Sequence, residues 1–124
     1  MKCDVVIISY NTKILVANCI QSIYNTSLKY VQNIIVVDNC SSDGTVEYLK
    51  TNYPDVIIVK NEGNYGYSYA VNRGVEQSSS EFVIISNSDV IYLDKSIERL
   101  LEKLSKSKKI AAAFPRQIFP DGSY

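Results

Sequence analysis

Residues 81–90, EFVIISNSDV, decide how this chain folds. Their short β-branched run is bounded by turn formers, which predicts a buried strand rather than a helix. Such a strand carries the amide of Asn87, the hydroxyl of Ser88 and the carboxylate of Asp89 to the rim of a sheet. These oxygen ligands suit a divalent cation and its phosphates. Taken alone, the stretch is better explained as a loop in which Asp89 caps a helix, so the rest of the chain must decide.

Similar apolar runs recur along the chain and alternate with stretches of helical spacing. The expected strands cover residues 4–10, 33–38, 56–60, 82–85 and 110–114. Helices are expected over about 12–24, 42–51 and 67–77, with a fourth capped by Asp94. This alternation predicts an α/β fold of three layers, a mainly parallel sheet with helices on both faces. The 124 residues suffice for one domain, 1–124.

Composition excludes several classes of function. The formal net charge is zero, which argues against a nucleic-acid partner held by bulk charge. The chain has no histidine, so His-based nucleophile systems and His-ligated zinc are excluded. Its three cysteines lack CxxC spacing and are expected to be reduced thiols. With no signal peptide and no run of membrane-spanning length, the expected location is cytoplasmic.

Polar residues follow each of the first four expected strands. In parallel sheets, ligands bind outside the carboxyl ends of the strands, where the strand order reverses. We therefore expect four segments to converge on one nucleotide-sized groove, with Asp38 and Asp89 on opposite flanks. Turn and cap chemistry explains each cluster singly, and in part it explains Asn11, Ser42 and Asp43.

The polar rim best fits a nucleoside diphosphate. The chain contains neither a GxGxxG fingerprint nor a GxxxxGK[ST] loop, which argues against a dinucleotide fold and excludes a P-loop. Asp38 is suited to accept hydrogen bonds from a base or a hydroxyl. Asn87 and Asp89 are suited to a metal that bridges phosphates and neutralises a leaving diphosphate.

Five ordered motifs carry a resemblance that covers nearly the whole chain. They are VVIISYNT at 5–12, IIVVDNCSSDGT at 34–45, NEGNYGYSYAVNRG at 61–74, FVIISNSDV at 82–90 and PRQIFPDGS at 115–123. In these motifs the sequence resembles the N-terminal, nucleotide-binding half of a family 2 glycosyltransferase with the GT-A fold. The likeness is to the bacterial rhamnosyltransferase-like and polysaccharide-synthesis branch.

The resemblance implies a set of site residues. Asp89 with Asn87 would hold Mg²⁺ or Mn²⁺ at the family's Asp-x-Asp position, although the amide of Asn87 removes one charge from the usual pattern. The residues implied in nucleotide binding are Ser9, Tyr10, Asn11, Asp38, Asn39, Ser41, Asn64, Gly66, Asn72, Asn87 and Ser88.

The resemblance also implies an inverting transfer from a UDP- or dTDP-sugar to a saccharide or lipid-linked acceptor. In the family, the catalytic base comes from sequence beyond the fifth strand region, so no residue of this chain is assigned to it. The chain alone is therefore expected to bind donor with little or no transferase activity. Peripheral membrane association and homodimerisation of a full-length protein are compatible with this assignment.

Two other classes of function stay open at this point. A phosphoacceptor signalling module also places an aspartate at a strand end, as Asp38 is placed here. It needs an acidic pair after the first strand, which Ser9, Tyr10 and Asn11 do not supply. The second alternative is a non-catalytic interaction domain that kept the fold and lost the chemistry. Asn87, in place of the family's usual aspartate, favours it, and so does the lack of the family's catalytic base in this chain.

Overall fold

Four parallel strands form the centre of the molecule in the order β3-β2-β1-β4. The computed structural model describes residues 1–124. The strands are β1 (Cys3–Ser9), β2 (Val31–Asp38), β3 (Ile57–Lys60) and β4 (Phe82–Asn87). The chain builds the sheet outward from β1 through β2 to β3, and then places β4 on the other side of β1. The strand order therefore reverses between β1 and β4.

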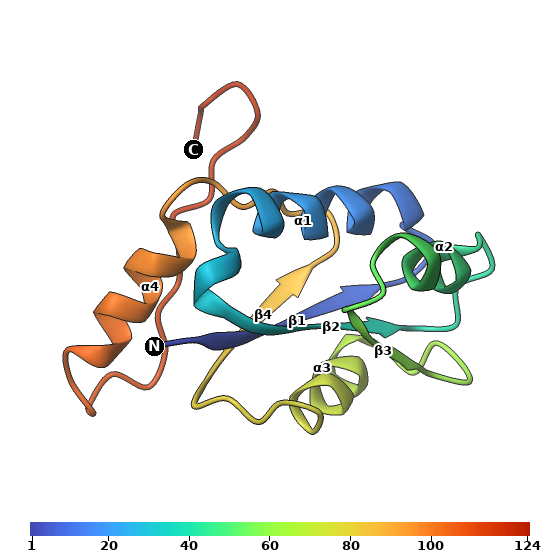
Figure 1. Ribbon diagram of the computed structural model, residues 1–124, viewed down its shortest axis with the longest axis horizontal. Helices are drawn as coiled ribbons and strands as arrows, with labels where there is room; N and C mark the ends of the chain where they lie inside the picture. Colours follow the sequence, from blue (N-terminus) through green and yellow to red (C-terminus); the bar gives the residue numbers. More distant parts are fainter.

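Helices cover both faces of this sheet (Figure 1). Helices α1 (Lys13–Thr26) and α2 (Thr45–Asn52) lie on one face, and α3 (Tyr67–Val75) lies on the other. Helix α4 (Ser96–Ser105) packs near the start of β1, and a short 3₁₀ turn, Leu28–Tyr30, leads into β2. The predicted three-layer α/β architecture is confirmed.

The two faces have separate cores, which explains the continuous apolar runs of the central strands. Every residue of β1 is buried, and alternate side chains point to opposite faces. Val5 and Ile7 join the larger core with α1, α2 and α4, whereas Val6 and Ile8 join the smaller core beneath α3. A strand buried on both faces needs apolar residues pointing both ways, so Val5–Ile8 show no polar alternation. Asp4 and Ser9, near the two ends of β1, are buried polar residues that are hydrogen-bonded.

Helix α3 approaches the sheet closely because residue 74 has no side chain. A Cβ atom at Gly74 would overlap Cγ1 of Val6 and lie 2.9 Å from Cγ2 of Val37. Ala70, one turn earlier, is fully buried on the same face. The next residue, Val75, is exposed, so the helix turns its glycine and not this valine toward the sheet.

Two expectations about the C-terminal third are wrong. Residues 110–114 form no strand, and the sheet ends at β4. The segment after α4 runs back past the sheet without joining it (Figure 1). Asp94 does not cap α4, because the N-cap position falls on Lys95, which has a φ of 61° and makes no side-chain cap hydrogen bond. Asp121 and Gly122 lie in a turn, in which the backbone N–H of Ser123 donates to Asp121 Oδ1.

None of the helices combines the length and apolar character needed to cross a membrane. All three cysteines are free, and Cys3 and Cys19 are buried while Cys40 is exposed. That the thiols are reduced stays a prediction.

Candidate nucleotide-binding groove

The carboxyl ends of the strands finish at nearly one level. In the parallel register Ser9 pairs with Asp38, Asp38 pairs with Lys60, and Ile8 pairs with Asn87. The polar segments that follow each strand therefore meet along one edge of the sheet, as the sequence predicts.

A groove of about 370 Å³ lies at this edge, across the point where the strand order reverses. It receives residues from all four segments that follow the strands. Its lining consists of Ile8, Tyr10, Thr12, Leu15, Asn39, Asn64, Tyr67, Asn87, Ser88 and Asp89.

A chain of hydroxyl groups fixes the floor of the groove. The hydroxyls of Ser9 and Thr12 are 2.9 Å apart, and Thr12 donates to Ser88 Oγ at 2.9 Å. Ser9 and Ser88 are nearly inaccessible to solvent. These contacts tie the loop after β1 to the loop after β4, so the two sides of the groove are held in a fixed relation.

The β4 end presents its ligand groups outward. Asn87 and Asp89 are both exposed and both line the groove. The backbone is held from behind by α1, where Cys19 Sγ lies 3.9 Å from the carbonyl oxygen of Asn87 as a weak donor. Burial raises the pKa of Cys19 to about 12, so the thiol keeps its proton at neutral pH.

The residues at the β4 end fit a metal ion only in part. No group of three or more His, Cys, Asp or Glu side chains comes together anywhere in the chain. Asp89 supplies one carboxylate, and Asn87 adds an amide oxygen. Mg²⁺ commonly binds through one or two carboxylates together with substrate phosphates. The donor set therefore fits a divalent cation shared with a diphosphate, and does not form an all-protein site.

Asp38 does not form the opposite flank of the groove, which corrects the expected placement. The residue is fully buried, and its carboxylate accepts hydrogen bonds from the backbone N–H of Ser41 at 2.9 Å and from the Ser41 hydroxyl at 2.6 Å. A carboxylate at the end of a buried strand is satisfied most easily by the turn that follows it. Asn39, the next residue, takes the place on the groove wall.

Asn11 joins two loops instead of lining the groove. Its backbone N–H donates to Ser41 Oγ at 2.8 Å, and its side-chain oxygen accepts from the backbone N–H of Ser42 at 2.8 Å. Asp43 completes this connection by accepting from the backbone N–H of Lys13 at 3.0 Å. The first turn of α1 is thus capped by a distant residue, and Thr12 makes no side-chain cap hydrogen bond.

The loop after β3 closes the remaining side of the groove. Asn64 Oδ1 accepts from the backbone N–H of Gly66 at 3.1 Å. Gly66 has a φ of 92°, which only glycine adopts readily, and α3 begins at the next residue. Of the expected site residues, Ser9, Asn11, Asp38, Ser41, Gly66 and Asn72 do not line the groove, although Ser9 supports its floor.

Four lining residues were absent from the expected set. Thr12 and Leu15 are three positions apart at the start of α1, a spacing that places both on one helix face and was a usable signal. Tyr67 opens α3, next to Gly66. Ile8 belongs to the continuous apolar run of β1, so the sequence indicates a core residue there and gives no sign that it lines the groove.

Comparison with known proteins adds a sequence relationship. The family model described as "Glycosyl transferase family 2" matches residues 4–124. An N-acetylglucosaminyl-diphospho-decaprenol L-rhamnosyltransferase of Mycobacterium tuberculosis is 32% identical over 102 residues, which covers 73% of this chain and 33% of that protein. A poly-beta-1,6-N-acetyl-D-glucosamine synthase of Staphylococcus epidermidis is 32% identical over 107 residues, covering 83% of this chain and 25% of that protein.

Solved structures share the fold at lower identity. The mannosyltransferase PcManGT from Pyrobaculum calidifontis, in complex with GDP-Man and Mn²⁺, superposes with a TM-score of 0.75 at 21% identity, over 84% of this chain and 32% of that one. TarS 1–349 of S. aureus gives a TM-score of 0.74 at 21% identity, over 86% of this chain and 33% of that one. The chain thus spans about a third of the length of these two structures and a third or less of the two curated relatives.

Proposed function

Because the chain belongs to glycosyl transferase family 2, we propose that its groove binds the nucleotide diphosphate of a sugar donor. One observation carries this proposal: polar residues after all four parallel strands line one groove at the reversal of strand order. That is the place where α/β sheets of this kind bind nucleotides. Tyr10, Asn39 and Asn64 are the groups assigned to the nucleoside side, and Asn87, Ser88 and Asp89 to the phosphates.

A divalent cation, Mg²⁺ or Mn²⁺, belongs to this proposal as a ligand shared with the donor. Asp89 would hold it, with Asn87 beside it, and it would offset the charge of the leaving diphosphate. Because Asp89 is the one carboxylate at the end of β4, we expect the chain to bind the metal only weakly when no nucleotide is present. The likeness to a mannosyltransferase solved with GDP-Man and Mn²⁺ is consistent with such a ternary site.

The chain's own residues account for binding and orientation of the donor, not for the transfer itself. The Ser9–Thr12–Ser88 hydroxyl chain keeps the β1 and β4 loops in place, and Asp38 and Ser41 hold the β2 loop behind Asn39. The expected transfer is inverting: a carboxylate outside this chain deprotonates a hydroxyl of a saccharide or lipid-linked acceptor. The acceptor oxygen then bonds to the anomeric carbon of the donor sugar as the bond from that carbon to the nucleoside diphosphate breaks. A cytoplasmic location, peripheral membrane association and homodimerisation remain predictions for a full-length protein.

Calorimetric titration of the chain with UDP, dTDP and GDP, with and without Mn²⁺, tests the proposal. We expect at least one nucleotide to bind, and to bind more tightly with Mn²⁺. Asp89→Asn should abolish the increase in nucleotide affinity that Mn²⁺ produces, and should leave the affinity measured without metal nearly unchanged. Asp94→Asn, which changes an exposed carboxylate outside the groove, is the matched control. Failure of all three nucleotides to bind, or an undiminished Mn²⁺ effect in Asp89→Asn, would contradict the proposal.

The donor-binding role is separable from catalysis in the same samples. We expect the isolated chain to show little or no glycosyl transfer while it binds nucleotide. Measurable transfer to a saccharide acceptor would refute the assignment of the catalytic base to sequence outside this chain.

A further inference from the structure

The segment that carries Asp89 has no backbone hydrogen bonds of its own. It comprises residues 88–92, which follow β4, and none of them takes part in a backbone–backbone hydrogen bond. A segment of this kind is flexible unless side chains or burial hold it, because its peptide groups are tied to neither helix nor sheet. The position of the Asp89 carboxylate therefore depends on contacts from elsewhere in the chain.

Polar side chains of α1 hold this segment at both ends. At its start, the hydroxyl of Thr12, the N-cap residue of α1, donates to Ser88 Oγ at 2.9 Å. At its end, Ser22 Oγ accepts from the backbone N–H of Tyr92 at 2.9 Å, in a buried hydrogen bond. The segment runs along α1 in this way before it turns away to α4 (Figure 1). Asp89 lies between the two contacts.

Cys19 contributes a third and weaker contact from the same helix. Its thiol faces the carbonyl oxygen of Asn87, with Sγ 3.9 Å from that oxygen. Cys19 and Ser22 are three positions apart, which places both on one face of α1, and they are only 0% and 8% exposed. A buried hydroxyl is unfavourable unless it is hydrogen-bonded. Ser22 meets that requirement by donating to the carbonyl oxygen of Cys19 at 2.7 Å and by accepting from Tyr92.

The ends of the segment are anchored, whereas its ligand groups are accessible. Tyr92 is 9% exposed and belongs to the larger core, which it shares with α1. Asn87 and Asp89 are exposed and line the groove. A ligand group that is already held in place binds an ion without a further loss of conformational entropy. The contacts from α1 therefore bear directly on how well Asp89 can bind a cation.

We propose that Thr12, Cys19 and Ser22 are positioning residues that hold Asp89 where a divalent cation meets the donor diphosphate. This inference rests on the proposed function, because it concerns the cation that Asp89 shares with a nucleotide. Cys19 and Ser22 do not line the groove, and they act on Asp89 only through the backbone of residues 87 and 92. Loss of their contacts should therefore weaken the metal-dependent part of nucleotide binding and spare the contacts to the nucleoside.

Calorimetric titration of Ser22→Ala with UDP, dTDP and GDP, with and without Mn²⁺, tests this inference. We expect the increase in affinity that Mn²⁺ produces to fall about threefold or more, because the Tyr92 N–H loses its acceptor. The affinity measured without metal should change less. Ser27→Ala is the matched control, because Ser27 is also a buried serine, but its hydroxyl is hydrogen-bonded to Thr26 and not to the segment. It should keep the Mn²⁺ effect of the parent.

Thr12 offers a second comparison at a less buried position. Thr12→Val has nearly the same shape without the hydroxyl, whereas Thr12→Ser keeps the group that donates to Ser88. We expect Thr12→Val to lose more of the Mn²⁺ effect than Thr12→Ser. Because Thr12 is only partly buried, this pair decides the question if Ser22→Ala fails to fold.

NMR relaxation of the ligand-free chain measures the positioning directly. We expect the backbone amides of residues 88–91 to have order parameters near those of rigid backbone, about 0.85. The order parameters of these residues should fall in Ser22→Ala and in Thr12→Val, and should stay unchanged in Ser27→Ala. This measurement needs neither nucleotide nor metal, and a general loss of stability would not confine the change to one segment.

Either of two results would overturn the inference. The first is unchanged order of residues 88–91 in both Ser22→Ala and Thr12→Val. The second is a Mn²⁺ effect that these variants keep in full, or that falls only in step with the affinity measured without metal. If the parent chain binds no nucleotide, or gains no affinity from Mn²⁺, the proposed function fails and this inference falls with it. A parent that binds with Mn²⁺, and variants that match it, contradict this inference alone.

Discussion

Gly74 is the residue whose replacement should disturb the fold most directly. In Gly74→Ala the new methyl group meets Val6 and Val37, so α3 must move away from the sheet. Overpacking of this kind costs about 1–3 kcal/mol, against a gain of up to about 1 kcal/mol in helix propensity. We expect a net loss of stability in urea unfolding. Ser68→Ala, at an exposed position of the same helix, is the control and should be neutral or slightly stabilising.

Asp4 should make stability depend on pH at the acid end. Burial alone raises the pKa of its carboxyl, but hydrogen bonds from Ser78, Ser79 and Asn33 outweigh burial and hold the pKa below its ordinary value. A pKa that is lower in the folded state gives stability that is present above the unfolded value, about 3.9, and is lost as pH falls through the folded value.

Asp4→Asn should therefore flatten the fall in unfolding free energy between about pH 5 and pH 2. Urea unfolding at several pH values measures this change in the free energy of unfolding. Asp94→Asn, at an exposed carboxylate, serves as the comparison. An unchanged slope in Asp4→Asn would mean that other carboxylates carry the acid dependence.

The sequence predicts where a residue lies in the fold better than it predicts where its side chain points. The position of Asp38 at a strand end follows from the apolar run before it. The direction of its carboxylate does not, because the choice between a ligand and the Ser41 turn depends on a local loop geometry that no periodicity encodes. Asn39 and Asp89 were predicted at the rim and do line the groove, since both follow strands whose ends the parallel register aligns.

Among the elements, the loops after β1 and β2 should act as one unit through Asn11. This residue has a φ of 51° and binds Ser42 through its side chain. Asn11→Gly keeps access to the left-handed backbone but loses the side-chain hydrogen bond, whereas Asn11→Ala loses both. We expect Asn11→Ala to lower the free energy of unfolding more, with the hydrogen bond alone worth about 1 kcal/mol. Equal losses, measured by urea unfolding, would show that the backbone conformation contributes little.

The elements themselves were largely predictable where the periodicity was strong. Strands at β1 and β2 and the apolar stripe through Ile97 and Leu101 follow directly from residue spacing. Residues 110–114 show why the rest was not. A short apolar run has strand character, but a strand exists only where a neighbour offers hydrogen bonds, and none pairs with this segment here. Phe114, at 89% exposure, has no core to enter.

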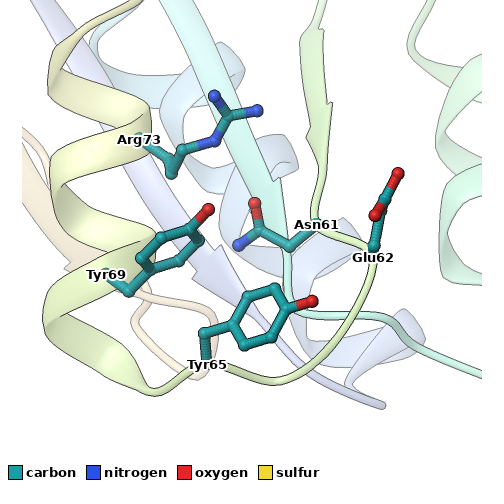
Figure 2. A pocket seen from close by; sticks show the side chains of 5 residues that line it. All are labelled: Asn61, Glu62, Tyr65, Tyr69 and Arg73. Carbon is teal, nitrogen blue, oxygen red and sulfur yellow. The ribbon is translucent and has the colours of Figure 1, made fainter.

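At the scale of the whole molecule, convergence on one groove was predictable, and a second cavity, between the loop after β3 and α3, was not (Figure 2). Four parallel strands necessarily bring their carboxyl ends to one edge, so the order of motifs sufficed to locate the groove. The cavity beside α3 depends on how far that helix stands from β3. Neither Arg73 nor Tyr69 follows a strand, so no rule about strand ends points to them.

The outer edge of β4 determines how isolated copies of this chain should behave together. β4 pairs only with β1, so its other edge has unpaired backbone groups, and Ile85 on it is 48% exposed. An uncovered edge with exposed apolar side chains is a template for pairing with another chain. We expect association that rises with concentration in analytical ultracentrifugation. Ile85→Lys should reduce it, because a charge on an edge strand opposes pairing, while Ile14→Lys at the exposed surface of α1 should not. If both variants associate as the parent does, contacts elsewhere hold the copies together, and the exposed Phe114 and Phe119 become the next residues to change.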